Sequence, residues 1–163
     1  MEINFKLTVL LFGIICTGLT AGLCFTWSNA VTPGIGRLDD YGFLSAFQGM
    51  NRSIINPMFL IVFFSPVFTL FISSYMFKSN STTFWFILIA AILFFAGVAL
   101  VTIFGNVPLN EVLDKTNLET LSTTDLQDLR NKFEQPWNRF HMIRTITSTL
   151  SLASLLIGLI YSK

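Results

Sequence analysis

The segment FEQPWNRFHMIRT, residues 133–145, contains the side chains of this sequence that are best suited to chemistry. Among them is the single histidine, His141, and the segment stands directly before the last long apolar stretch. If a helix starts at Pro136, then Trp137, His141 and Arg144 share one face, because each residue advances a helix by about 100°. Histidine can exchange a proton near neutral pH, and arginine can stabilise an anion. The segment therefore predicts an acid–base or anion-binding site.

Structural roles are also open to these residues. Arg144 can reach back to lipid headgroups, and Trp137 can belong to the aromatic belt at a membrane surface. For Trp137 alone the belt is the better interpretation. For His141 and Arg144 together the site is favoured, because ionisable groups within a membrane helix rarely face lipid. Arg139 points away from this face and is expected to anchor the helix at the headgroups.

The distribution of charge predicts the elements that position this segment. The chain has 163 residues, of which 53% are hydrophobic and only 12% are charged, a composition too apolar for a soluble globule. The uncharged stretches are residues 7–36, 53–77, 79–110 and 145–162. Since a membrane-spanning helix needs roughly 20 apolar residues, we expect four transmembrane helices. They are placed at about 5–32, 54–77, 83–105 and 138–161, as an all-α four-helix bundle forming one domain over residues 1–163.

The first apolar stretch has an alternative interpretation as a cleaved signal peptide. It is longer than a typical signal-peptide core, and its polar tail WSNAVTPG lacks a small-residue cleavage site, so a retained helix is favoured. Cys16 and Cys24 both lie in this stretch. Their spacing puts them on the order of 12 Å apart along a helix, too far for a disulfide. The net charge of +1 provides no basic patch, so no nucleic-acid partner is expected.

Two further helices are expected outside the apolar stretches. After a cap at Asp39 or Asp40, an amphipathic helix is predicted to run into the second span, with kinks at Pro57 and near Pro66. A second, short amphipathic helix is predicted to begin at Ser122 or Thr123 and to bury Leu126, Leu129 and Phe133. Most charges fall in the loops 33–53 and 106–140, so the polar groups gather on one membrane face. The positive-inside rule favours a cytoplasmic location for these loops, but their acidic residues leave the orientation open.

Asparagines at the edges of the spans extend the candidate site. Gly18 and Gly22 form a GxxxG pair, which admits a close helix neighbour within the chain or in a homo-oligomer. On the same side, Asn29 is predicted to point into the bundle, either to fix packing or to bind a ligand. Asn106 follows Gly105, a natural helix terminator, and is expected at the same membrane edge. The sequence therefore predicts a polar cavity near one membrane face.

Familiar catalytic patterns are absent from the sequence. With a single histidine there is no HExxH zinc motif, and neither a phosphate-binding P-loop nor a GxGxxG motif occurs. The cysteines are remote from His141, which makes a cysteine–histidine nucleophile a poor hypothesis. Few carboxylates lie near the membrane, so a metal site of the usual kind would be short of ligands. We therefore expect no metal.

Three parts of the chain carry a resemblance to a known family. They are GLTAGLCFTWSNAVTPGIGRLDD (18–40), MNRSIINPMFLIVF (50–63) and the pair FGNVPLNE (104–111) with FEQPWNRFHMIRT (133–145). In this order they resemble the anthrone-oxygenase-like family of small four-helix membrane proteins, formerly a domain of unknown function. The resemblance implies an oxidoreductase that converts anthrones to anthraquinones with molecular oxygen and without an organic cofactor. The polar positions that match are Asn29, Arg37, Asn51, Asn106, Asn110, Trp137, Asn138, His141 and Arg144.

The resemblance gives these residues expected roles. An anthrone carries an acidic C–H, so an enzyme needs a base and donors that hold the developing enolate. His141 is the expected base, Arg144 the second catalytic group, and the asparagines, Arg37 and Trp137 the expected substrate-binding residues. The expected partners are membrane lipids and a lipophilic, enolisable aromatic molecule of the anthrone or hydroquinone type, in a multi-pass protein of the cell membrane. The alternative is a non-enzymatic membrane protein whose polar cluster binds a lipid or quinone headgroup or locks the helices.

Overall fold

The computed structural model describes residues 5–162, which form helices joined by short turns, with no strand among them. The elements are α1 Phe5–Thr26, η1 Trp27–Val31, α2 Thr32–Ile35, α3 Asp40–Ile54, α4 Pro57–Met76, α5 Ser81–Phe94, η2 Phe95–Leu100, η3 Thr102–Asn106, α6 Val107–Lys115, η4 Leu118–Thr120 and α7 Thr123–Ile160. Segments η1, η2 and η3 are π-helical and η4 is a 3₁₀ turn. Residues 1–4 and Lys163 of the expected domain lie outside the described residues.

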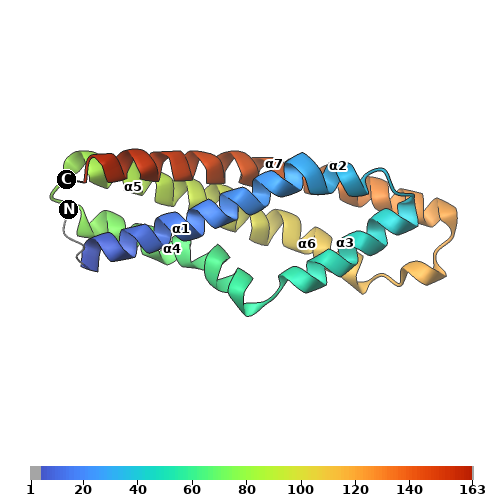
Figure 1. The fold of residues 1–163 in the computed structure, drawn as a ribbon. Coiled ribbons are helices and arrows are strands. Elements are labelled where there is room, and N and C mark those ends of the chain that lie inside the picture. The colour runs from blue at the N-terminus through green and yellow to red at the C-terminus, as the bar shows by residue number, and fades with distance from the viewer. Residues whose placement is uncertain (1–4, 163) are drawn as a thin grey trace.

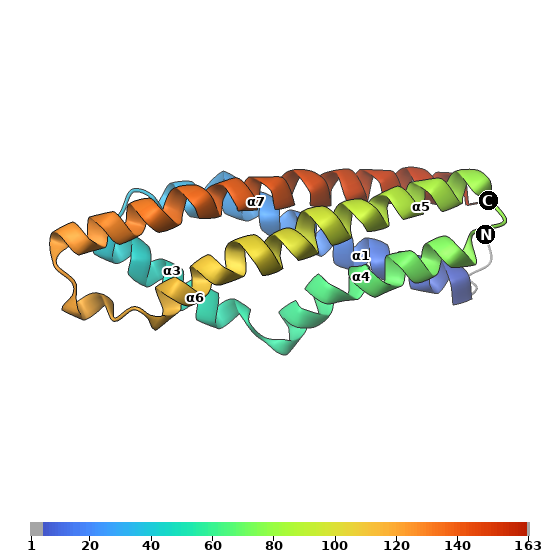
Figure 2. The same cartoon turned by 180° about the vertical axis from the view of Figure 1, so that it is seen from behind.

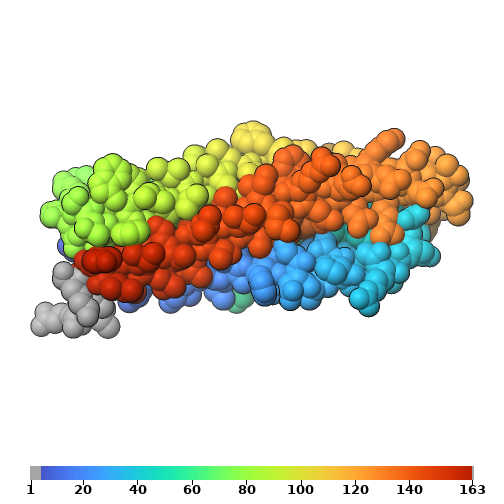
Figure 3. Space-filling view, turned by 90° about the horizontal axis from the view of Figure 1, so that it is seen from above, coloured from blue at the N-terminus to red at the C-terminus, as the bar shows by residue number. Residues whose placement is uncertain are grey.

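Four continuous helical rods in the described residues are long and apolar enough to cross a membrane: Phe5–Ile35, Pro57–Met76, Ser81–Lys115 and Thr123–Ile160. The predicted all-α four-helix transmembrane bundle is therefore confirmed. The start of α1 and the end of α7 lie at one end of the bundle, while α3 and α6 lie toward the other (Figure 1). Seen from behind, α5 and α6 form one long rod beside α7 (Figure 2). From above, α7 runs between this rod and α1 (Figure 3).

The last helix begins well before the expected residue 138. Ser122 and Asp125 form a capping box, in which the Ser122 hydroxyl accepts from the Asp125 backbone N–H at 3.2 Å. From there α7 continues through Pro136, so the expected separate amphipathic helix and the fourth span are one element. The reason is packing, because Leu126 and Phe133 before Pro136 and Trp137 after it are all buried in the same apolar core. This continuous apolar stripe holds the chain in one helix despite the proline.

The second span differs from expectation at its start. Asp39 caps α3 as predicted, accepting a hydrogen bond from the Gly42 backbone N–H at 2.8 Å. However, α3 ends at Ile54, and α4 begins anew at Pro57. Asn56 is extended and its side chain accepts from the Phe59 N–H at 3.0 Å, so it caps a new helix where a kink at Pro57 was predicted. The outcome is a sharp corner between α3 and α4 (Figure 1).

Two apolar cores hold these elements together. The first lies within the spans and includes Leu10, Leu70, Phe94 and Leu155, all fully buried. The second joins α3, α6 and α7 through residues such as Phe43, Phe47, Leu113 and Trp137. Trp27 of η1 packs against the second core. The polar segment at residues 133–145 therefore spans the junction between the two cores.

The closest approach of two helices does not occur at the predicted GxxxG pair. A Cβ added at Gly18 would meet Leu152 at an ordinary 3.7 Å, and one at Gly22 would meet nothing within 4 Å. The prediction of a close neighbour at this pair is thus wrong within the chain. Instead, Gly97 in η2 lies directly against Thr147 of α7, and Gly105 in η3 lies against Phe140, whose Cγ would be 2.7 Å from an added Cβ. These two glycines allow the third rod to pack on α7.

Replacing Gly97 with alanine is expected to destabilise the protein by about 1–3 kcal/mol, because the added methyl overlaps the Cβ and hydroxyl of Thr147. Thr147 is β-branched and cannot swing aside freely. Thermal unfolding in detergent measures the effect. The matched control is Gly22→Ala, which meets open space and gains helix propensity, so its melting temperature should stay equal or rise slightly. Equal melting temperatures for both variants would contradict the close contact.

Candidate functional site

A cavity of about 310 Å³ lies where the two cores meet. Its walls come from α1, η1, α3, α4, η3, α6 and α7, and its lining residues are Leu23, Cys24, Trp27, Asn51, Arg52, Ile54, Ile55, Phe59, Phe63, Thr102, Val107, Asn110, Glu111, Asp114, Lys115, Trp137, His141 and Arg144. Such a volume is at the small end of the range for ligand pockets, roughly 300–1,000 Å³. The lining combines aromatic and aliphatic side chains with polar ones. The sequence predicted a polar cavity, whereas this cavity has both apolar and polar walls.

Arg144 and His141 form a hydrogen-bonded pair in this cavity. The Arg144 Nη2 lies 2.7 Å from His141 Nδ1, and its Nη1 donates to the Thr102 hydroxyl at 3.2 Å. Because the arginine guanidinium only donates, His141 Nδ1 must be the acceptor. The ring proton therefore sits on Nε2, which donates to the Cys24 carbonyl at 3.0 Å. Both ring nitrogens are engaged, whereas the buried Nε of Arg144 has no hydrogen-bond partner.

Aromatic rings surround this pair. Trp137 stacks on the His141 ring with centroids 4.7 Å apart, and the Arg144 guanidinium lies 5.4 Å from the Trp137 ring centroid. Trp27 lies 5.6 Å from Trp137, and Phe47 meets Trp137 edge to face at 4.8 Å. Trp137 is 4% exposed, so its interpretation as a membrane-belt residue is wrong. Stacking and the cation–π contact hold the histidine and the arginine in fixed orientations.

The predicted asparagines and Arg37 separate into three groups. Asn51 and Asn110 line the cavity, and Asn110 accepts a hydrogen bond from Trp137 Nε1 at 2.8 Å. Asn106 is buried behind the wall, where its Nδ2 donates to the Trp137 carbonyl at 3.2 Å. Asn138, Asn29 and Arg37 are not among the lining residues.

The prediction that Asn29 points into the bundle is wrong, because its side chain is exposed. That prediction assumed an α-helical advance of 100° per residue. Asn29 lies in η1, whose π-helical turn changes the direction in which successive side chains point. The same segment directs Trp27 to the cavity. Arg37, also exposed, lies beyond the end of α2.

Comparison with known proteins assigns the chain to a family. The family described as anthrone oxygenase matches residues 46–154, which is more than half of the sequence. The chain belongs to the anthrone oxygenase family. The apolar rods make it a membrane protein of that family. No curated protein and no solved structure matches the chain.

The part that matches the anthrone oxygenase family contains most of the cavity wall. Asn51, Asn110, Trp137, His141 and Arg144 all fall within residues 46–154. The segment 18–40, which also carried the resemblance in sequence, lies outside this match. Its contribution to the cavity, including Trp27 and the Cys24 carbonyl, is therefore seen in the structure alone.

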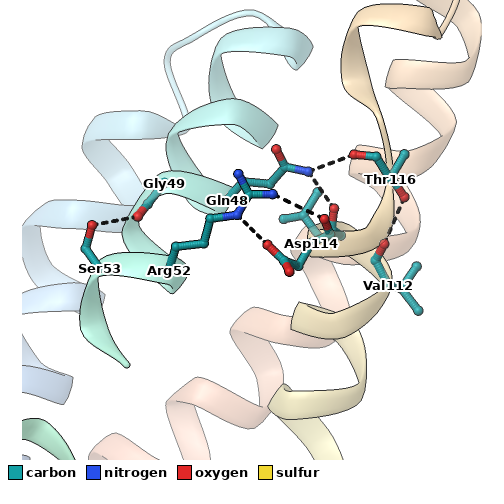
Figure 4. A network of polar contacts seen from close by, with 8 residues as sticks. Gln48, Gly49, Arg52, Ser53, Val112, Asp114 and Thr116 are labelled. Carbon is teal, nitrogen blue, oxygen red and sulfur yellow. Dashed lines mark hydrogen bonds and ion pairs between the residues drawn. The ribbon is translucent and has the colours of Figure 1, made fainter. Parts of the chain in front are cut away.

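Several contacts that hold the elements around the cavity of this anthrone oxygenase family member were not predicted. On α3, the Gln48 Nε2 donates to the carbonyls of Leu113 and Thr116 at 2.6 and 2.9 Å, and Arg52 pairs with Asp114 at 2.6 Å (Figure 4). These bonds satisfy carbonyls at the end of α6 and fix α3 against it. The spacing of four residues between Gln48 and Arg52 was the available signal, since it places both on one helix face.

Arg130 was also missed, although it organises the loop between α2 and α3. Its guanidinium donates to the Gly36 and Leu38 carbonyls at 2.9 Å each, and it pairs with Asp40 at 3.1 Å and Glu134 at 2.7 Å. The spacing of four residues predicts the Arg130–Glu134 pair on α7. No pattern in the sequence predicts the contacts with the loop, because the loop is remote from α7 along the chain. Among the described residues, no three His, Cys, Asp or Glu side chains come close enough together to hold a metal ion.

Proposed function

We propose that this protein is a membrane oxygenase that oxidises a lipophilic, enolisable aromatic molecule of the anthrone or hydroquinone type with molecular oxygen. The observation that carries the proposal is Arg144, a permanent cation in the wall of a cavity that also has two tryptophans and two phenylalanines in its lining. Its Nε is buried and has no hydrogen-bond partner. A flat aromatic anion matches both the charge and the rings.

The proposed reaction converts one anthrone and one O₂ to one anthraquinone and one water. The ring CH₂ opposite the carbonyl loses a proton, and the electron pair moves toward the carbonyl oxygen to give an enolate that Arg144 stabilises. The carbon then forms a C–O bond with O₂, giving a hydroperoxide after protonation. Loss of the second proton from that carbon breaks the O–O bond and forms the new C=O. The released hydroxide takes up a proton as water, so O₂ is the only oxidant required.

His141 was expected to be the base, and its geometry supports a different role in this proposal. Its Nδ1 lone pair is already bonded to Arg144, and its Nε2 proton is bonded to the Cys24 carbonyl. A base needs a free lone pair within reach of the substrate proton. We therefore assign His141 as a positioning residue that aims Arg144 at the cavity, while enolate stabilisation by Arg144 lets the acidic C–H release its proton to solvent.

The purified protein in detergent should consume oxygen when supplied with anthrone at neutral pH. We expect one O₂ consumed for each anthraquinone formed, with no hydrogen peroxide left over, as the balanced reaction requires. An oxygen electrode and chromatography of the product measure both quantities. The control is protein-free detergent, because anthrone also reacts slowly with oxygen by itself. A rate equal to this control would reject the proposed function.

The competing function is that of a non-enzymatic membrane protein that binds a quinone or lipid headgroup. The same engaged ring nitrogens of His141 favour it, because they resemble a structural network more than a poised base. In that case anthraquinone or an anionic lipid would raise the melting temperature without any oxygen consumption. The two functions thus give opposite results in the oxygen-electrode experiment.

A further inference from the structure

The cavity has one buried end and one end at the surface. At the buried end, Phe63, Trp137 and His141 are each 4% exposed or less. The exposed lining residues form the mouth of the cavity, and they are Arg52, Ile55, Val107, Glu111, Asp114 and Lys115. In the described part of the chain, no exposed lining residue comes from α1, η1, α4 or α7. The mouth therefore lies between the α3–α4 corner and α6.

The α3–α4 corner lies at the edge of the hydrocarbon layer. It projects from the side of the bundle, between the two ends of the molecule (Figure 1, Figure 2). Helix α4 has 20 residues and is thus about 30 Å long, which matches the thickness of the hydrocarbon core. Polar segments bound it on both sides, with Asn56 before it and Lys78 after it. Its first residue, Pro57, therefore marks the hydrocarbon edge, and the mouth beside it opens sideways at that edge.

Apolar side chains surround the mouth on the side toward the hydrocarbon. Ile55 at the corner is 70% exposed, and Met58 in the first turn of α4 is 77% exposed. Phe104, three residues before Val107 on the opposite rod, is 76% exposed. Inside the cavity, Phe63 lies six residues beyond the start of α4, roughly 9 Å below the hydrocarbon edge. The apolar part of the cavity is therefore at the depth of the lipid acyl chains.

The charged side chains of the mouth belong to α3 and α6, which continue beyond the hydrocarbon edge. Arg52 pairs with Asp114 at 2.6 Å (Figure 4), and Lys115 pairs with Glu111 at 3.1 Å. Each cation of the mouth thus has an acidic partner, and the four groups together carry no net charge. An anionic headgroup would have to displace a carboxylate from its cation. The mouth is therefore suited to hold a lipid by its chain and not by the charge of its headgroup.

We propose that the cavity opens sideways into the bilayer and takes up an acyl chain of a membrane phospholipid when no other apolar ligand occupies it. The chain enters between Ile55 and Val107. It then lies against Leu23, Phe59 and Phe63, while its headgroup stays outside beside the paired charges. This site goes beyond the proposed function, because it holds whether or not the protein is an oxygenase. It also differs from the competing function, in which a headgroup is the ligand.

Trp137 can report an acyl chain in the cavity, because it lines the cavity and is 4% exposed. Combining Trp27→Phe with Trp85→Phe leaves it as the single tryptophan of the sequence. This protein is reconstituted into phosphatidylcholine vesicles with bromine near the top of one acyl chain, and into the same vesicles without bromine. Bromine quenches tryptophan fluorescence only at close range. We expect the brominated lipid to remove most of the Trp137 fluorescence, and an absence of quenching would overturn the inference.

Lipid on the outer surface of the bundle is a second source of quenching, so the mouth is narrowed in the same single-tryptophan protein. Val107→Phe adds a ring at the mouth and should reduce the quenching. Ile103→Phe is the matched control, because Ile103 is exposed on the same rod but does not line the cavity. Its quenching should equal that of the parent protein. Equal quenching in all three proteins would mean that bromine acts from outside, and the inference would be rejected.

The melting temperature in detergent shows whether the single-tryptophan protein folds. If it does not, Val107→Phe and Ile103→Phe are compared in the otherwise unmodified protein, where Trp85 contributes equally to both. Brominated lipid should then quench Val107→Phe less than Ile103→Phe. Neither measurement uses an aromatic substrate or oxygen. Oxygen consumption without lipid quenching would reject this site and uphold the proposed function, whereas mouth-dependent quenching without oxygen consumption would do the reverse.

Discussion

Replacing Arg144 with methionine is expected to lower kcat for anthrone oxidation by about 100- to 1,000-fold, the usual effect of removing one donor to a developing oxyanion. Methionine keeps much of the side-chain volume but cannot donate to the enolate oxygen. The Nη contacts to His141 and Thr102 are lost with it. Oxygen consumption with saturating anthrone, corrected for the protein-free rate, measures kcat.

Arg139 provides the matched control on the same helix. It is exposed and is not among the lining residues of the cavity, so Arg139→Met removes the same charge without touching the site. Its kcat should equal that of the unmodified protein. Arg144→Lys keeps the charge but loses the planar fork, and an intermediate rate is expected. If Arg144→Met folds with an unchanged melting temperature and a full rate, Arg144 has no catalytic role.

Substitution of His141 is expected to have the second large effect on kcat. Comparing two different substitutions distinguishes a positioning role from a base role. In His141→Ala, Arg144 loses its acceptor at 2.7 Å, and we expect kcat to fall by about 100-fold, within the range for mispositioned groups. In His141→Asn, the amide oxygen can occupy the place of Nδ1 and accept from Arg144. An amide is not a base near neutral pH. The positioning role therefore predicts that His141→Asn keeps kcat within about tenfold of the unmodified protein.

A base role predicts the opposite pattern. Both His141→Ala and His141→Asn would then lose about 100- to 10,000-fold, the range for removal of a general base. The pH profile gives a second measurement. If His141 were the base, kcat would fall in acid through titration of the imidazole, and this dependence would vanish in His141→Asn. An unchanged profile in a still active His141→Asn variant is expected for the positioning role.

Much of the architecture follows from local properties of the sequence. The four uncharged stretches are each long enough to require a membrane helix, and bilayer thickness alone then sets the number of spans. The helix caps at Asp39 and Ser122 could also be predicted from local sequence. In each cap the side chain accepts a hydrogen bond from the backbone N–H three residues later, so no distant part of the chain is involved. Helical spacing also predicted that Trp137, His141 and Arg144 share a face, and all three line the cavity.

Other features of the protein depend on contacts between helices, and only the tertiary structure decided them. The direction of Asn29 depends on a π-helical turn, and no regular α-helical spacing predicts where such a turn occurs. The close approach at Gly97 could be predicted only by knowing which helix faces it. The GxxxG pair, in contrast, predicted a close contact that the bundle does not make. The engagement of both His141 nitrogens involves the carbonyl of Cys24, on a helix at the other end of the sequence. The residue types thus determined which side chains could act as acids, bases or donors. Hydrogen-bond partners on distant helices decided which of these groups are still free to act on a substrate.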